Sequence, residues 1–583
     1  MRPAAAAITA FLSRRSSSLS SSSLVRVSKL TPTAASNSRR MTVYSFSHRD
    51  SLARALSVNA GGSGKNENYN GFSGEKHDGA RNRKHPSRKQ LKRAFSSSST
   101  TLAAAASSSD RTCSTRGTRA VELLPVYLTD ARAVEQYCPD TCPDGALQLS
   151  VAENQMLEDL LVPAVRGFAS PSSAANNEEE TFFNDMIYYQ PTPGRPALRK
   201  AMADYLRRIL DLPGELDAEG MVVGAGCNAV LENLCICLAN PGEGVLIPTP
   251  YYAAFEFDLV ARAGLDIIPV PTLGHHPEVT IENDAAVPPE AYYPNRSSLD
   301  AAVAVARESG TEPKILLLSH PNNPLGVCYP PSVIKECIDW GRENEIHVVS
   351  DEIYAGSVYR ESATSTEDPT FESALSIASR DTSGEGLGIG PYVHFVYALS
   401  KDFCLSGLRV GAAYSENPDI RMPMQKLNDL CQISSQTQLL VERMLTAPST
   451  ADGGGYWSTD EFLPEARRRM RDRNGRLETC LDEMGIPHLT ADAGMFVWMD
   501  MREFLPPRGD DGAAVESQES IDTRERTLYL EMLQEHGLLF TPGRSMKNEL
   551  PGFFRCVFTA ASDDEFDLAL ERIVKFVEEK RGL

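Results

Sequence analysis

From about residue 120 onward, short runs of β-branched and aliphatic residues alternate with longer amphipathic stretches. The short runs are MVVGAG, GVLIPTP, LDIIPV, KILLLSH, EIHVVSDEIY, HFVYALS and LRVGAAYS. Between them lie stretches such as NAVLENLCICLA and PSVIKECIDWGRENE, which have the apolar spacing of helices. This alternation predicts an α/β fold in which helices pack against a mainly parallel central sheet.

The chain divides into four predicted segments. Residues 1–118 are rich in Ser, Ala and Arg, and the opening MRPAAAAITAFLSRRSSSLSSSSLVRVSKL contains no acidic residue, so we predict a disordered leader with a transit peptide. Residues 119–190 are expected to form an N-terminal arm and part of a small domain. The alternating pattern fills 191–425, the predicted large domain, and 426–583 should form a smaller α+β domain.

The composition of the leader favours an organelle. Its arginine content is typical of a mitochondrial signal, and its serine and alanine content also fits a plastid signal. Without such import the protein would remain cytoplasmic. The tract RNRKHPSRKQLKR could instead be a nuclear or nucleic-acid patch, although a solvated linker accounts for it more simply.

Charge is divided unevenly along the chain. Residues 1–110 contain 18 Lys and Arg against 5 Asp and Glu, whereas the whole chain has a net charge of −20. The remaining residues are therefore strongly acidic and would repel phosphates, so we expect no nucleic-acid partner. The longest apolar runs are much shorter than the roughly 20 residues that span a bilayer, so we expect no membrane association.

The twelve cysteines are scattered along the chain. Cys235 and Cys237 lie in an apolar segment, and Cys138 and Cys142 lack the CxxC pairs or neighbouring histidines of a zinc site. The sequence therefore predicts no metal site, and it predicts free thiols in a reducing compartment.

Polar side chains follow almost every predicted strand. In chain order these are Cys227 and Asn228, Tyr251 and Tyr252, Asn323, Asp351 and Tyr354, Lys401, and Arg409. Ligands of open α/β sheets bind at the carboxyl ends of the strands, so we expect these side chains to lie together.

This set of side chains suits pyridoxal 5′-phosphate (PLP). A lysine in an apolar site loses its proton readily and can form a Schiff base with the aldehyde. A carboxylate such as Asp351 keeps the ring nitrogen protonated, so that the ring accepts electrons. The helix that begins in GAGCNAV presents free backbone N–H groups to a phosphate, which Arg409 can also bind.

Three blocks resemble those of a known family. PNNPLG, SDEIY and SKDFCLSGLRVG are similar to signature blocks of the class I aminotransferases, which are PLP enzymes of fold type I. The blocks occur in the family's order, each after a predicted strand, and the resemblance extends from about residue 120 to the C-terminus. It implies a large domain with a mainly parallel sheet and a smaller α+β domain.

The resemblance also implies roles for single residues. Lys401 would bind PLP covalently, Asp351 would pair with the ring nitrogen, and Tyr354 and Asn323 would bond the ring hydroxyl. The phosphate would be held by Arg409, Ser400 and the backbone of Cys227 and Asn228, and Tyr252, with Tyr251 as the second choice, would stack on the ring.

Two further stretches resemble substrate-binding segments. PGFFRCVFTA is similar to the family's segment whose arginine takes the substrate carboxylate, here Arg555; a helix cap or a structural ion pair is the alternative. LQLSVAENQMLEDLL resembles 1-aminocyclopropane-1-carboxylate (ACC) synthases and ACC-synthase-like proteins, in which the glutamate of AENQ, here Glu153, approaches the substrate. Glu153 could instead only complement the dipole of the following helix.

Three positions depart from the family's pattern. Thr192 stands where ACC synthases generally have a substrate-binding tyrosine that reaches the neighbouring subunit's site. Ala398 replaces a phosphate-binding serine, and His320 replaces an asparagine and is interpreted as a packed strand-end residue.

Three functions remain open at this level. The first is an ACC-synthase-like enzyme that acts on an α-amino acid, converting S-adenosylmethionine to ACC and methylthioadenosine or performing a related β/γ elimination. The second is an amino-acid transaminase, and the third is an idle PLP-binding protein with a regulatory role. The catalytic residues Lys401, Asp351 and Tyr354 are common to the first two. The resemblance also implies a homodimer.

Overall fold

The computed structural model of the protein describes residues 114–169, 186–275, 286–360, 371–380, 387–450, 454–508 and 516–583. The predicted transit peptide and the basic tract lie outside these residues, so the organelle stays a prediction. Helix α4 (Thr115–Glu122) spans the predicted boundary at residue 118. The domain boundaries likewise stay predictions. No helix in the described ranges combines the length and the apolar character that a bilayer crossing requires.

A seven-stranded sheet forms the centre of the larger α/β part. Its strands are β2 (Met221–Gly224), β3 (Gly244–Pro248), β4 (Asp266–Val270), β5 (Pro313–Ser319), β6 (His347–Asp351), β7 (Val393–Ala398) and β8 (Gly411–Ser415), in the order β2-β8-β7-β6-β5-β3-β4. Neighbouring strands run parallel except β8, which is antiparallel to β2 and β7. The predicted α/β fold with a mainly parallel sheet is confirmed.

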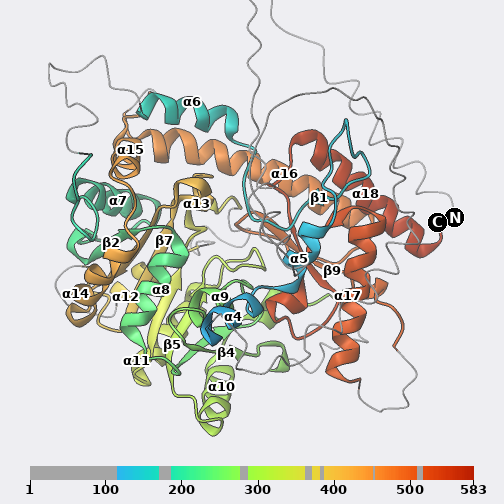
Figure 1. Cartoon of the computed structure of the whole chain (residues 1–583), viewed down its shortest axis with the longest axis horizontal. Helices are drawn as coiled ribbons and strands as arrows, with labels where there is room; N and C mark the ends of the chain where they lie inside the picture. Colours follow the sequence, from blue (N-terminus) through green and yellow to red (C-terminus); the bar gives the residue numbers. More distant parts are fainter. Residues whose placement is uncertain are drawn as a thin grey trace, which may run out of the picture. The chain divides into compact units, whose positions relative to one another are not determined.

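Strands β3, β7 and β8 are buried along their whole length because helices cover both faces of the sheet. Alternate residues of β5 point to opposite faces: Leu316 and Leu318 belong to one apolar cluster, Ile315 and Leu317 to another. One face packs α10 (Arg296–Glu308), α11 (Pro331–Glu343) and α12 (Ala374–Ser379). The other face packs α8 (Cys227–Leu238), α9 (Phe255–Val260) and α14 (Pro418–Leu427). Figure 1 shows α8 lying along the strands of this sheet.

A second, smaller sheet contains residues of the C-terminal part. It comprises β9 (Phe496–Asp500), β11 (Thr541–Pro542) and β12 (Phe553–Val557), all antiparallel in the order β11-β12-β9. The helices of this part are α16 (Leu463–Glu483), α17 (Gln518–Glu535) and α18 (Asp563–Arg581). Helices α7 (Pro196–Ile209) and α15 (Ser435–Thr446) pack on each other.

The N-terminal arm is fastened to the C-terminal part. Strand β1 (Leu147–Gln148) pairs in parallel with β10 (Leu538–Leu539). Helix α5 (Val126–Ala133) contacts α17, where Arg526 pairs with Asp130 at 2.9 Å. The arm comes from the start of the described sequence, and it therefore lies against elements from near the end of that sequence (Figure 1).

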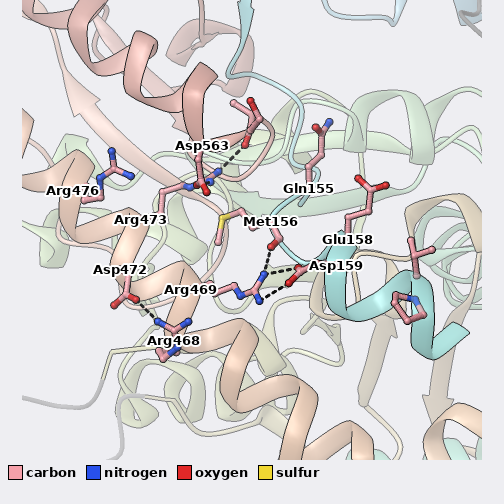
Figure 2. Close-up of a pocket in the computed structure, with 14 residues that line it drawn as sticks. Gln155, Met156, Glu158, Asp159, Arg468, Arg469, Asp472, Arg473, Arg476 and Asp563 are labelled. Atoms are coloured by element: carbon pink, nitrogen blue, oxygen red, sulfur yellow. Dashed lines mark hydrogen bonds and ion pairs between the residues drawn. The ribbon is translucent and has the colours of Figure 1, made fainter. Parts of the chain in front are cut away.

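A surface groove of about 870 Å³ lies between α6 (Glu158–Ala169), α16 and the start of α18. In Figure 2, Arg469 extends from α16 toward Asp159, whereas Arg468 pairs with Asp472 of the same helix. Arg469 Nη1 donates to Met156 O at 2.6 Å and pairs with Asp159 at 2.7 Å, while Arg473 pairs with Asp563. The Arg469 contacts hold the segment after Glu153 against α16, and the Arg473 pair holds the start of α18 there.

Strand β8 and the start of α8 approach each other so closely that only glycine fits. A Cβ atom at Gly411 would lie 2.5 Å from the carbonyl carbon of Gly226 and 2.8 Å from Cys227 N, both backbone atoms that a rotamer change cannot move. Gly226 has a φ of +97°, a left-handed conformation that glycine adopts at little cost.

We expect Gly411→Ala to lower the free energy of unfolding by about 1–3 kcal/mol, because the methyl group must push β8 away from α8. Gly407→Ala is the matched control, since a Cβ there meets no atom within 4 Å and should change stability by less than about 0.5 kcal/mol. Urea unfolding of both variants measures the difference. Equal stabilities would contradict the close packing described here.

Candidate active site

The carboxyl ends of β5, β6 and β7 bring the predicted residues to one edge of the sheet. Ser319 of β5 is in register with Asp351 of β6, and Asp351 is in register with Val396 of β7. Lys401 lies in the short helix α13 (Leu399–Asp402), which follows β7 directly. Asn323 follows β5 in the same way, as expected for parallel strands.

Lys401 lies against the N-terminal arm. Its Nζ donates to the carbonyl of Ala152 at 2.5 Å, next to Glu153. The pKa of Lys401 is lowered to about 8, mainly by burial and next by the charge of Arg555, whereas the carboxylate of Glu153 acts in the opposite direction. A larger fraction of this amine is therefore neutral and nucleophilic near pH 7 than for an ordinary lysine.

Asp351 is buried at the end of β6. Its Oδ1 accepts from Ile353 N at 3.3 Å and from the Cys227 thiol at 3.7 Å. Burial raises the pKa of Asp351 to about 7, and the charge of Lys401 opposes this rise. A protonated ring nitrogen facing Asp351 would favour its ionised form, because opposite charges at short range stabilise each other.

The start of α8 offers a phosphate site beside Arg409. Gly226 caps the helix without a side-chain hydrogen bond, and the first N–H groups of a helix have no intrahelical acceptors. Arg409 Nη2 donates to Asn228 Oδ1 at 3.0 Å, and its Nη1 donates to Ser406 O at 3.0 Å. Arg409 and the backbone of Cys227 and Asn228 thus meet at the start of α8. Ser400, the fourth predicted phosphate residue, is buried in α13 next to Lys401.

An acid that sequence reasoning missed lies at this end. Asp258 of α9 bonds Asn228, and the pKa of Asp258 is raised to about 6 mainly by burial, while Arg409 acts to lower it. The segment YYAAFEFDL carries no signal that places Asp258 here, because only the packing of α9 against α8 does so.

Arg555 on β12 reaches the same site from the small sheet. Its Nη1 donates to Asn323 Oδ1 at 2.7 Å, and its Nη2 donates to Ser150 O at 2.7 Å. Both of these acceptors are neutral, and the buried Nε has no hydrogen-bond partner. An unpaired buried guanidinium N–H fits a site that awaits a carboxylate, rather than a helix cap or a structural ion pair.

Aromatic residues enclose this region. Tyr354 is buried and packs edge-on against Phe496 with ring centroids 5.4 Å apart, and Arg555 lies 5.2 Å from the centroid of the same Phe496 ring. Tyr252 is 36% exposed and packs edge-on against Phe255 with ring centroids 5.4 Å apart, so its stacking on the cofactor stays a prediction. Tyr251 is buried instead and donates to Glu256 at 3.0 Å.

Glu153 is held by a residue that the sequence did not single out. Ser406 donates to Glu153 Oε1 at 2.8 Å, and Thr559 donates to the Glu153 carbonyl at 2.6 Å. Helix α6 begins only at Glu158, so Glu153 precedes the first turn.

The three unusual positions have different surroundings. The backbone carbonyl of Thr192 accepts from Asn428 Nδ2 at 2.5 Å. The role of the Thr192 side chain in a neighbouring subunit's site stays a prediction. His320 is buried, stacks 4.7 Å from Phe371, and its pKa is lowered to about 4 by burial, as expected of a packed neutral imidazole. Ala398 precedes α13 as its N-cap and supplies no side-chain hydrogen bond.

Comparison with known proteins identifies the family. The family model described as "Aminotransferase class I and II" matches residues 162–573. The chain belongs to this family. It is therefore a PLP-dependent enzyme, and Lys401, Asp351 and the α8 terminus with Arg409 form a site whose charges and donors fit the cofactor.

The chain is also similar to individual plant proteins. It is 33% identical over 446 residues to 1-aminocyclopropane-1-carboxylate synthase 5 of Oryza sativa subsp. japonica, covering 76% of this chain and 75% of that protein. It is 31% identical over 438 residues to synthase 11 of Arabidopsis thaliana, covering 75% and 85%.

Solved structures share the fold. Aspartate aminotransferase from Thermus thermophilus with maleate gives a TM-score of 0.58 at 20% identity, covering 80% of this chain and 99% of that one. The aromatic aminotransferase from Pyrococcus horikoshii OT3 gives a TM-score of 0.58 at 18% identity, covering 80% and 100%. The predicted fold type I is confirmed.

In the described ranges, no three His, Cys, Asp or Glu side chains gather in a way that could hold a metal ion.

We expect covalent capture of PLP by the cofactor-free protein, trapped with borohydride, to rise with pH and level off above a midpoint near 8. Only the neutral amine attacks an aldehyde, and the pKa of Lys401 lies near 8 rather than at its ordinary value of 10.5. Arg555→Gln should raise the midpoint, and Glu153→Gln should lower it, because their charges act oppositely on Lys401. Midpoints that move in the same direction, or not at all, would contradict this electrostatic description.

Proposed function

We propose that the protein is an ACC-synthase-like lyase that acts on an α-amino acid, with S-adenosylmethionine as the first candidate substrate and ACC and methylthioadenosine as its products. The observation that carries this proposal is the position of Glu153. The arm holds it beside Lys401, whose Nζ contacts the preceding residue, and Ser406 bonds its carboxylate. A carboxylate there can attract a cationic group of the substrate, such as a sulfonium.

The other residues can perform the common steps of such a reaction. Arg555 binds the substrate α-carboxylate through its fork of donors. Lys401, once its amine is free, removes the Cα proton as general base, which its lowered pKa allows near neutral pH. Bound PLP supplies the electron sink for the pair left on Cα. Loss of the Cγ leaving group with closure of a Cα–Cγ bond would then give the three-membered ring.

A second candidate, an amino-acid transaminase, is favoured by Thr192. The side chain of a threonine is much smaller than the tyrosine expected there, so one wall of an ACC synthase pocket would be missing. The third candidate, an idle PLP-binding protein, has less support because Lys401, Asp351 and Arg555 all occupy positions suited to chemistry.

Incubation of the purified enzyme with S-adenosylmethionine should yield ACC and methylthioadenosine in equal amounts, measured by mass spectrometry. Lys401→Ala should reduce the rate by at least about 10²-fold, the lower range for loss of a general base. Glutamate formed from an amino acid and 2-oxoglutarate, without ACC, would instead establish the transaminase. If the PLP-loaded protein formed neither ACC nor glutamate, the result would support the third candidate, the idle PLP-binding protein.

We further propose a homodimer, supported by an exposed apolar run just before Thr192. Ile187 and Tyr188 are each 69% exposed and Tyr189 is fully exposed, an arrangement that water disfavours and a protein surface could cover.

Tyr188→Ser combined with Tyr189→Ser should shift the enzyme toward monomer in sedimentation velocity experiments, because the buried aromatic area is lost. Val305→Ser is the matched control, since Val305 is 67% exposed on α10, away from this run in sequence. A similar dimer fraction in both variants would contradict an interface at this run.

A further inference from the structure

The segment between α5 and β1 brings two cysteines opposite each other. Cys138 N donates to Cys142 O at 3.1 Å, and Cys142 N donates to Cys138 O at 2.9 Å, so the two residues form one antiparallel pair closed by the turn Pro-Asp-Thr. Side chains of directly opposed residues lie on the same face of such a pair. Both side chains are thiols here, and both are partly exposed.

This pairing has dimensions that a disulfide accepts. Opposed residues that exchange both hydrogen bonds have Cα atoms about 5.5 Å apart. Disulfide-bonded cysteines have Cα atoms roughly 4.4–6.8 Å apart, most often about 5.5–6 Å. The Cα separation expected for this pair therefore suits a disulfide, while the Cβ atoms, about 4.5–5.5 Å apart in opposed residues, must approach by about 1 Å to reach the disulfide range of about 3.5–4.5 Å.

Contacts outside the turn hold the two cysteines in this arrangement. Arg572 of α18 donates to Pro143 O at 2.8 Å and to Gly145 O at 2.7 Å. A Cβ atom on Gly145 would lie 2.5 Å from the carbonyl oxygen of Gln136, so the flanking backbones are packed tightly. The fold thus preorganises a pair that a free five-residue segment would only sample.

The two thiols differ in reactivity. Hydrogen bonds from Thr141 and from the turn backbone lower the pKa of Cys138, whereas burial and the neighbouring Glu135 raise the pKa of Cys142. Each of the other nine described cysteines has a raised pKa, with burial as the first cause. Cys138 is therefore the described cysteine best suited to react as a thiolate.

We propose that Cys138 and Cys142 form a reversible dithiol–disulfide site, oxidised by exchange with a small-molecule disulfide. The Cys138 thiolate attacks one sulfur of the reagent, whose S–S bond breaks and releases one thiolate. Cys142, deprotonated, then attacks Cys138 Sγ in the mixed disulfide and expels the second thiolate. The reagent is reduced to two thiols, which take up the two protons, and the protein gains one S–S bond.

The site adjoins the elements that carry the arm to the active site. On one side α5 packs on α17, where Tyr529 donates to Tyr127 O at 3.4 Å. On the other side β1 leads to Ser150 and Ala152, whose carbonyls accept from Arg555 and Lys401. Oxidation would close a covalent ring in the segment that joins these two attachments.

The full-length reduced protein, equilibrated in buffers of oxidised and reduced glutathione, tests this site. After rapid alkylation and digestion with trypsin, residues 133–166 form one peptide that contains Cys138 and Cys142 and no other cysteine. In oxidising buffers we expect this peptide to carry no alkyl group and to weigh two hydrogen masses less than the unalkylated dithiol peptide. Cys235, which is buried on α8, and Cys237, which is half-buried on the same helix, should remain alkylated, because side chains two residues apart on a helix do not face each other.

Two comparisons make the result decisive. The same titration in guanidinium measures the unfolded chain, and we expect the disulfide to form at least about tenfold more favourably in the folded protein because the pair is preorganised. Cys142→Ser should retain glutathione on Cys138, and Cys138→Ser should take up glutathione several-fold more slowly. No disulfide in the folded protein, or one no more favourable than in guanidinium, would overturn the proposal; equal uptake by the two variants would overturn the assigned roles.

Discussion

The arrangement of charge at the carboxyl edge of the seven-stranded sheet governs this structure. Lys401, Asp351 and Arg555 all lie where water is largely excluded, and an isolated charge is costly there. The protein responds by shifting the pKa of Lys401 downward and that of Asp351 upward, and by surrounding Arg555 with neutral oxygens. A bound cofactor and substrate that bring complementary charges would satisfy these groups together.

The site is assembled from distant parts of the chain. The sheet supplies Asp351 and Lys401, the small sheet supplies Arg555, and the N-terminal arm supplies the carbonyls of Ser150 and Ala152. The arm is in turn held by β10 and by Arg469 of α16. Any movement of the small sheet relative to the large one would therefore change the distance between Lys401 and Arg555.

Much of the fold was predictable because each central strand is a continuous apolar run flanked by turn residues. Lys401, Asp351 and Asn323 could be placed because they directly follow such strands, and parallel strands end at one edge. Asp258, Ser406 and the carbonyl of Ser150 could not, because their positions depend on packing between segments with no common periodicity. Local sequence also left open whether Glu153 serves only the helix after it; α6 begins five residues later.

The sequence by itself determined the order of strands and helices, and it determined which residue types stand at the strand ends, because hydrophobic periodicity and turn chemistry act over short distances. Only the tertiary structure decided that Arg555 meets Asn323, that Ser406 holds Glu153, and that Cys138 faces Cys142 under the restraint of Arg572. Such contacts form when the chain closes long loops around a common core, and their geometry depends on the whole packing.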